Sequence, residues 1–115
     1  MTQWQKSYDT FLARIQETGE LWSLSCEEGW VICDSAEFED TEVMPFWSSK
    51  AEAQRHCVEQ WDDYQAERVS LADFVELWLP NLAEDDILVG PDWNDDLEGL
   101  EVEPGDLAES LLAQQ

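Results

Sequence analysis

The sequence predicts an α+β fold, a small antiparallel β-sheet with three to four helices packed on it. Apolar residues recur at helical spacing in several stretches, and short apolar runs bounded by glycine or proline are typical of strands. The elements follow in the order helix, strands, helix, helix, strand, helix, which favours an α+β class. The chain of 115 residues suits one domain, residues 1–115, with a hydrophobic core of its own.

The first predicted helix lies at the N-terminus and ends at Gly19, where glycine is a frequent C-cap. Its apolar face has the spacing of a helix and consists of Trp4, Tyr8, Phe11, Leu12 and Ile15. Two apolar runs on either side of a short turn with Gly29 then predict a β-hairpin over about 21–35.

A polar loop, AEFEDTE, is expected over 36–42, and a third strand near 42–47. Pro45 in this strand predicts an edge position or a strand end, because proline cannot donate a ladder hydrogen bond. A further strand is expected near 87–90, where the apolar run ILVG stands between polar segments.

Two helices are predicted between these strands, and each begins with a serine cap. Ser49 and Glu52 form an S-x-x-E capping box, and Ser70 stands three residues before Asp73. The apolar stripe of the first is Ala53, Cys57, Trp61 and Tyr64, and that of the second is Leu71, Phe74, Val75, Trp78 and Leu79. Pro80 is expected to end the second helix near Leu79. A last helix is expected from Pro104, with Leu107, Leu111 and Leu112 on one side.

Negative charge dominates the composition: 28 acidic residues stand against 5 basic ones, for a formal net charge of −23. The bases are Lys6, Arg14, Lys50, Arg55 and Arg68, and no lysine or arginine follows. Such a chain is not expected to bind nucleic acid directly or to bind an anionic membrane, because both require a basic surface. Its 7 Trp, 4 Phe and 2 Tyr argue against an acidic disordered chain.

Three cysteines, Cys26, Cys33 and Cys57, are an odd number, and MTQWQKSYDT has no apolar leader segment. We therefore expect a cytoplasmic protein without a disulfide framework. Cys57 is interpreted as a small core residue and the adjacent His56 as a surface residue. No cofactor is predicted, and no motif assigns a catalytic residue.

One stretch resembles a calcium-binding EF-hand loop, because Asp92, Asn94, Asp96 and Glu103 match its oxygen ligands. Leu97 stands where that loop has its glycine, and Gly99 where it has an apolar residue. These four residues are therefore weak metal candidates, and nonspecific cation condensation is the favoured interpretation of the acidic segment.

The ordered pattern of the chain, from about residue 8 to 110, resembles a family of small acidic bacterial proteins catalogued only as a domain of unknown function. The shared residues are Gly29-Trp30, Pro45 and Trp47, Trp61 and Tyr64, and the S-L-x-x-F…W-L-P-x-L block from Ser70 to Leu82. The resemblance implies an α+β fold and a bacterial cytosolic setting. It implies no activity, so no functional residue is carried over.

The function predicted from these observations is a non-enzymatic protein-interaction module with a basic partner, since a field of one sign steers a complementary one. The expected contact residues are Trp93 as an apolar anchor, with Glu84, Asp85, Asp86, Asp92, Asp95, Asp96 and Glu98. Packing against a neighbouring element is the favoured alternative for Trp93. Three alternatives for the protein stay open: a toxin-immunity or nucleic-acid-mimic inhibitor, acidity that only adapts the surface to salt, and a divalent-metal-binding or enzymatic role of the 92–103 loop.

Overall fold

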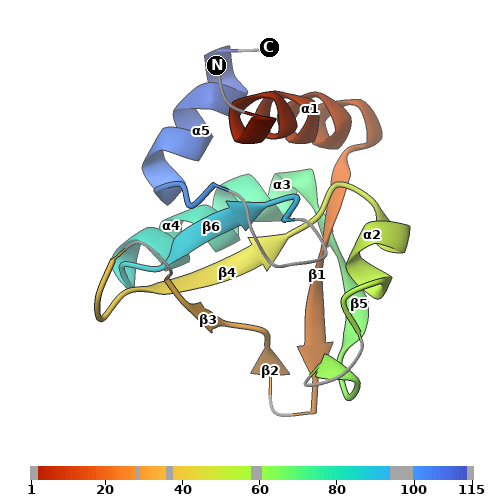
Figure 1. The fold of residues 1–115 in the computed structure, drawn as a ribbon. Helices are drawn as coiled ribbons and strands as arrows, with labels where there is room; N and C mark the ends of the chain where they lie inside the picture. Colours follow the sequence, from red (N-terminus) through yellow and green to blue (C-terminus); the bar gives the residue numbers. More distant parts are fainter. Residues whose placement is uncertain (1–2, 28, 36–37, 58–60, 94–99, 114–115) are drawn as a thin grey trace.

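The computed structural model describes residues 3–27, 29–35, 38–57, 61–93 and 100–113 (Figure 1). It confirms a mixed α and β fold, with four helices and two sheets of three strands each. Three of the helices are α1 (Gln3–Thr18), α2 (Lys50–Gln54) and α5 (Pro104–Ala113). The fourth is continuous and consists of α3 (Leu71–Asp73), a π-helical turn (Phe74–Trp78) and α4 (Leu79–Glu84). The strands are β1 (Glu20–Cys26), β2 (Gly29–Trp30), β3 (Cys33–Asp34), β4 (Glu42–Phe46), β5 (Gln65–Ser70) and β6 (Leu88–Pro91).

Gly19 ends α1 as the sequence predicts. Its φ of +76° lies in the left-handed region, which glycine adopts without a steric cost. Its N–H donates to the Ile15 carbonyl at 2.8 Å, and its own carbonyl accepts from Leu71 N–H at 2.9 Å. The turn therefore starts β1 and also fixes the beginning of α3.

The predicted hairpin is present, but its second arm is divided between two sheets. β1 pairs antiparallel with β2, with Ser25 opposite Trp30, whereas β3 pairs antiparallel with β4, with Cys33 opposite Val43. The sheets have the strand orders β2-β1-β5 and β3-β4-β6, so the expectation of one antiparallel sheet is corrected to two. One pair, β4 with β6, is parallel.

The two sheets are joined where β1 meets the end of β4. Trp22 N–H donates to the Trp47 carbonyl at 2.8 Å, and Trp47 N–H returns a bond of 2.7 Å to the Trp22 carbonyl. The buried Ser23 hydroxyl donates to the Pro45 carbonyl at 2.8 Å. These bonds satisfy backbone groups that the change of sheet would otherwise leave buried without partners.

An edge position for the strand around 42–47 is wrong, because β4 lies between β3 and β6. Pro45 fits the other option, a strand end: it is the penultimate residue of β4, beyond the two residues that pair with β3. The hydrogen-bonded ladder between β3 and β4 ends before Pro45, so the N–H group that proline lacks does not interrupt it.

The predicted helix after Ser49 is much shorter than its stripe suggested. Ser49 Oγ accepts from Glu52 N–H at 3.2 Å, as the capping box predicts, but α2 ends at Gln54. Cys57, Trp61 and Tyr64 all contact the same core cluster as Ala53, although they do not continue the helix. The segment then becomes β5, which the sequence analysis missed and which pairs with β1 over six residues.

The helix that begins after Ser70 does not end at Leu79. Ser70 Oγ accepts from Asp73 N–H at 3.2 Å, which confirms the cap. The helix widens into a π-helical turn over Phe74–Trp78, where Leu79 N–H bonds to the Phe74 carbonyl, and continues as α4 to Glu84. The wider turn accommodates the Pro80 ring, whose clash and missing N–H would break a regular α-helix.

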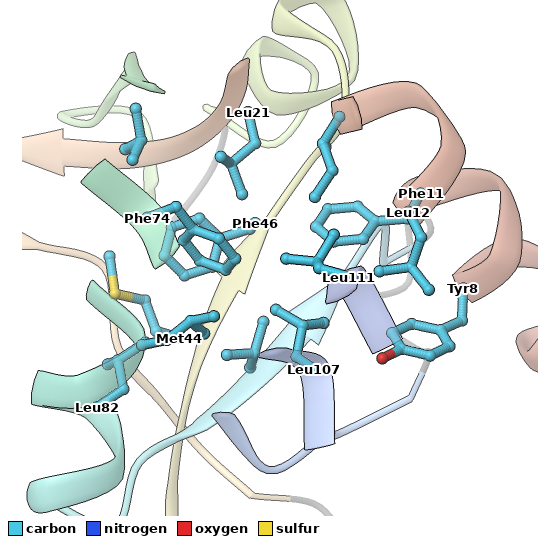
Figure 2. Close-up of a cluster of buried hydrophobic side chains, with 14 of the residues drawn as sticks. Tyr8, Phe11, Leu12, Leu21, Met44, Phe46, Phe74, Leu82, Leu107 and Leu111 are labelled. Atoms are coloured by element: carbon cyan, nitrogen blue, oxygen red, sulfur yellow. The ribbon is translucent and has the colours of Figure 1, made fainter. Parts of the chain in front are cut away.

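The core has two hydrophobic clusters on opposite faces of β4. Met44 and Phe46 contribute to the larger cluster, whereas Val43 and Trp47 belong to the other, as the alternation along a strand dictates. Figure 2 shows the larger cluster, in which α1 and α5 meet β4 and the Phe46 ring lies 5.0 Å from that of Phe74. Tyr8, Phe11, Leu12 and Ile15 of α1 and Leu107 and Leu111 of α5 are buried there, as predicted.

Within the described residues, no helix has the length and apolar character that crossing a membrane requires.

Candidate functional site

Trp93, the predicted apolar anchor, is a core residue: only 6% of it is exposed. Its ring lies against Gly90, where a Cβ atom would stand 2.3 Å from the indole. Trp93 Nε1 donates to the Leu100 carbonyl, and the Trp93 carbonyl accepts from Trp47 Nε1, both at 3.0 Å. Packing is therefore its role, and the expectation of a surface contact at Trp93 is corrected.

Asp92 has a structural role of the same kind. Its two carboxylate oxygens accept from Ser48, one from the backbone N–H at 2.7 Å and one from the hydroxyl at 2.9 Å. Burial raises the pKa of Asp92 to about 6, and the two bonds from Ser48 oppose that shift. Both oxygens of the carboxylate are thus engaged within the fold.

Of the other metal candidates, only Glu103 lies among the described residues. Asn94 and Asp96, and the predicted contact residues Asp95 and Glu98, lie outside the described residues. Glu103 is exposed at the start of α5, where its carbonyl accepts from Leu107 N–H at 3.0 Å. Among the residues that the structure describes, no group of three or more His, Cys, Asp or Glu side chains is arranged to hold a metal ion.

His56 is buried, and burial also affects the thiols of Cys33 and Cys57. His56 is only 7% exposed, which corrects the surface position predicted for it, and its ring stacks on Trp47 with a 4.5 Å centroid separation. Its Nδ1 lies 2.9 Å from the Glu52 carbonyl oxygen. Burial raises the pKa of Cys33 to about 11 and also raises that of Cys57, so both thiols stay protonated and unreactive at neutral pH.

Glu84, Asp85 and Asp86 are exposed at the end of α4, as a contact surface requires. The chain turns there through a Schellman motif, in which Ile87 N–H bonds to the Leu82 carbonyl at 2.9 Å and Asp86 N–H to the Ala83 carbonyl at 3.2 Å. Asp86 has a φ of +58° in this turn. The turn directs the chain from α4 into β6.

A hollow of about 720 Å³ opens beside this turn, and we call it the acidic hollow. Three segments that are distant in the sequence surround it: the β3–β4 connection, the end of α4 with the start of β6, and the start of α5 (Figure 1). Its lining residues are Phe38, Thr41, Ala83, Asp86, Leu88, Glu101, Val102, Glu103, Pro104, Gly105 and Asp106.

Hydrogen bonds between segments hold this arrangement together. Val89 and Val102 exchange two backbone bonds of 2.8 Å, which place the segment before α5 along the edge of β6. The Ser35 hydroxyl donates to the Glu101 carboxylate and accepts from Phe38 N–H at 2.9 Å. A second bond, from Ser35 N–H to the Thr41 carbonyl at 2.8 Å, closes the loop that carries Phe38.

The acidic hollow has charge of one sign and an exposed aromatic ring. All four of its charged lining residues are acidic: Asp86, Glu101, Glu103 and Asp106. Phe38 is 53% exposed, so burial of its ring by a ligand would contribute up to about 1.5–3 kcal/mol. The hollow can therefore offer carboxylates and an apolar surface to the same ligand.

Of the lining residues, Asp86 is predicted from the sequence as a contact residue and Glu103 as a metal candidate, whereas Phe38, Glu101 and Asp106 are not singled out. Phe38 was placed in a polar loop, and the only local signal was an aromatic residue among acidic ones. Glu101 and Asp106 carried no distinguishing mark in a segment rich in carboxylates. Their common position depends on the Val89–Val102 pairing, which joins segments that no local pattern connects.

Comparison with known proteins gives a match over nearly the whole chain. A family model matches residues 8–111, and its description reads "Protein of unknown function (DUF2750)". No curated protein matches the chain.

Proposed function

We propose that this protein is a non-enzymatic interaction module that binds a basic protein at the acidic hollow. The chain belongs to the DUF2750 family of proteins of unknown function. The observation that carries this proposal is the hollow itself. Its charged lining residues are all acidic, and Phe38 is exposed beside them. Interfaces combine apolar anchors with charges complementary to the partner.

The charge of the whole chain supports this assignment. A net charge of −23 attracts a basic partner over a distance and accelerates its encounter with the protein. Attraction of this kind is nonspecific, however, because exposed carboxylates also occur on α1, before β5 and on the helix over residues 71–84. The hollow supplies what the general charge lacks, a shaped surface that selects one partner.

The same distribution disfavours the nucleic-acid mimic among the alternatives. A mimic requires carboxylates concentrated in a row like the phosphates of a duplex, about one per 1.7 Å of axis. Exposed acidic residues here lie on elements throughout the chain, among them Asp9, Glu17, Asp62, Asp73 and Glu109. A toxin remains one kind of basic partner that the proposal includes, and an immunity role would use the same hollow.

The experiment compares three immobilised proteins in lysate of the source cells at low and at high salt. The first is the wild type. The second, the hollow variant, carries Asp86→Asn, Glu101→Gln, Glu103→Gln and Asp106→Asn. The third, a matched control with the same change in net charge, carries Glu17→Gln, Asp62→Asn, Asp63→Asn and Glu76→Gln at exposed positions outside the hollow.

We expect the wild type and the control to retain the same basic protein at low salt and to release it at high salt. The hollow variant should retain little of it, because its carboxylates no longer complement the partner. The absence of any retained basic protein at low salt would refute the proposed function. Equal retention by the hollow variant and the control would refute the hollow as its site.

A further inference from the structure

We infer that the occupant of the acidic hollow is an arginine-bearing segment of the partner, whose guanidinium group stacks on Phe38 while a neighbouring apolar side chain covers Ala83 and Val102. This inference rests on the proposed function and adds the chemistry that the hollow recognises. The hollow recognises arginine specifically, and not every positively charged side chain.

Phe38 is held in place for this role. Ser35 binds the Phe38 backbone on one side and the Glu101 carboxylate on the other, so the aromatic ring and one acidic group share a single anchor. The Ser35–Thr41 bond keeps the loop closed. A backbone that is positioned in advance reduces the conformational entropy lost when a ligand stacks on the ring that it carries.

The pairing of an aromatic face with carboxylates favours arginine over lysine. Guanidinium is planar and weakly hydrated, so it stacks on an aromatic ring and still donates through its edge to a carboxylate. Arginine also forms two parallel hydrogen bonds with one carboxylate, which a lysine ammonium group cannot do. Phe38 and the four acidic lining residues present both features within one hollow.

The size and floor of the hollow favour a peptide segment over a free cation. A volume of about 720 Å³ lies within the usual range of about 300–1,000 Å³ for ligand sites. It exceeds the space that a single ion fills. Ala83, which is exposed, and Val102, which is half-buried, line it with apolar surface. An apolar side chain next to the arginine would remove that surface from water.

Titration calorimetry with three short amidated peptides tests the inference. The first alternates arginine and leucine, the second has lysine in place of each arginine, and the third has serine in place of each leucine. We expect the first peptide to bind about three- to ten-fold tighter than the second, the size of a cation–π contact with added bidentate bonding. The third should bind more weakly than the first, because it cannot cover the apolar floor.

Variants of Phe38 identify the source of the arginine preference. Phe38→Leu keeps an apolar side chain but removes the aromatic face, so the ratio of arginine to lysine affinity should fall toward one. Phe38→Ala should weaken binding further. Leu77→Ala is the matched control, because Leu77 is 56% exposed on the helix over residues 71–84 and does not line the hollow. Circular dichroism confirms that each variant is folded.

Equal affinity of the arginine and lysine peptides for the wild type would overturn the inference. A preference that survives in Phe38→Leu, or the absence of saturable binding by either peptide, would overturn it as well. The proposed function has a separate readout, namely the loss of the cellular partner from the hollow variant. A partner that depends on the hollow while Phe38→Leu changes nothing would leave the function standing and remove the arginine assignment.

Discussion

At the scale of single residues, Asp92 is distinctive because its carboxylate is largely buried, whereas most carboxylates are exposed to solvent. Asp92 has a φ of +44° and lies close enough to Glu52 and Arg14 for both to affect its charge. Glu52 disfavours the ionised form and Arg14 favours it, but burial outweighs both. The folded protein therefore holds a proton on Asp92 more firmly than the unfolded chain does.

This linkage predicts that stability decreases as pH rises from about 4 to about 6. The folded pKa of about 6 lies above the usual value of 3.8, so the contribution of Asp92 is fully present below about 4 and lost above 6. Its size is about 2–3 kcal/mol, from about 1.4 kcal/mol per pKa unit. Asp92→Asn should remove the contribution of Asp92 to the pH dependence of the unfolding free energy. It should also raise the free energy of urea unfolding at pH 7.

The substitution suits the site, because asparagine also tolerates a positive φ and its amide oxygen can accept from Ser48 N–H. Asp63→Asn, at an exposed position, serves as the control and should leave the slope unchanged. Identical pH slopes for the wild type and Asp92→Asn would contradict the prediction.

At the scale of elements, local signals determine where the helices begin. Ser70 caps the longest run of helix outside α1, and its side chain satisfies an N–H group that the helix leaves without a partner. Ser70→Ala should lower the free energy of unfolding by about 1 kcal/mol, whereas Ser70→Asn should retain most of it, because asparagine is an equally good cap. Urea unfolding measures the free energy of both variants. An equal loss of stability in Ser70→Ala and Ser70→Asn would contradict the prediction, because only the second variant can still cap the helix.

The same local character explains how much of the fold could be predicted. The Gly19 C-cap, the Ser49 and Ser70 caps and the Pro104 start each depend on a few neighbouring residues, and the structure contains them all. β5 was missed because QAERVS buries only Val69 and so has no alternating apolar pattern. Its strand geometry comes from pairing with β1, in which partners such as Glu20 and Ser70 are far apart in the sequence.

The candidate site was harder to predict than the fold for a related reason. Trp93 stands among acidic residues, and its burial depends on the absence of a side chain at Gly90. Phe38 is exposed although it is aromatic. For Trp93 the acidic neighbours in the sequence indicated exposure and tertiary packing buried the ring, whereas for Phe38 the aromatic side chain indicated burial and the fold leaves it exposed.

At the scale of the whole molecule, repulsion between carboxylates acts across the fold. The radius of gyration is 13.1 Å, which exceeds the Debye length of about 10 Å at 0.1 M salt but is well below the length of about 30 Å at 0.01 M, so carboxylates on distant parts of the fold repel one another at low salt and are screened as salt is added. Sodium chloride should therefore raise the midpoint of urea unfolding without changing the m-value, because it screens repulsion and leaves the exposed area unchanged. The hollow variant and its matched control should both show a smaller effect, and a midpoint independent of salt would contradict this.

The contact between Gly90 and Trp93 constrains how the sequence can vary. Because an added methyl group would stand 2.3 Å from the indole, a larger residue at position 90 is compatible with this fold only if position 93 becomes smaller. The two positions should therefore change together or not at all. In a collection of related sequences, a glycine three residues before a tryptophan would mark the chains that carry this buried ring, and paired substitutions would mark those that repacked it.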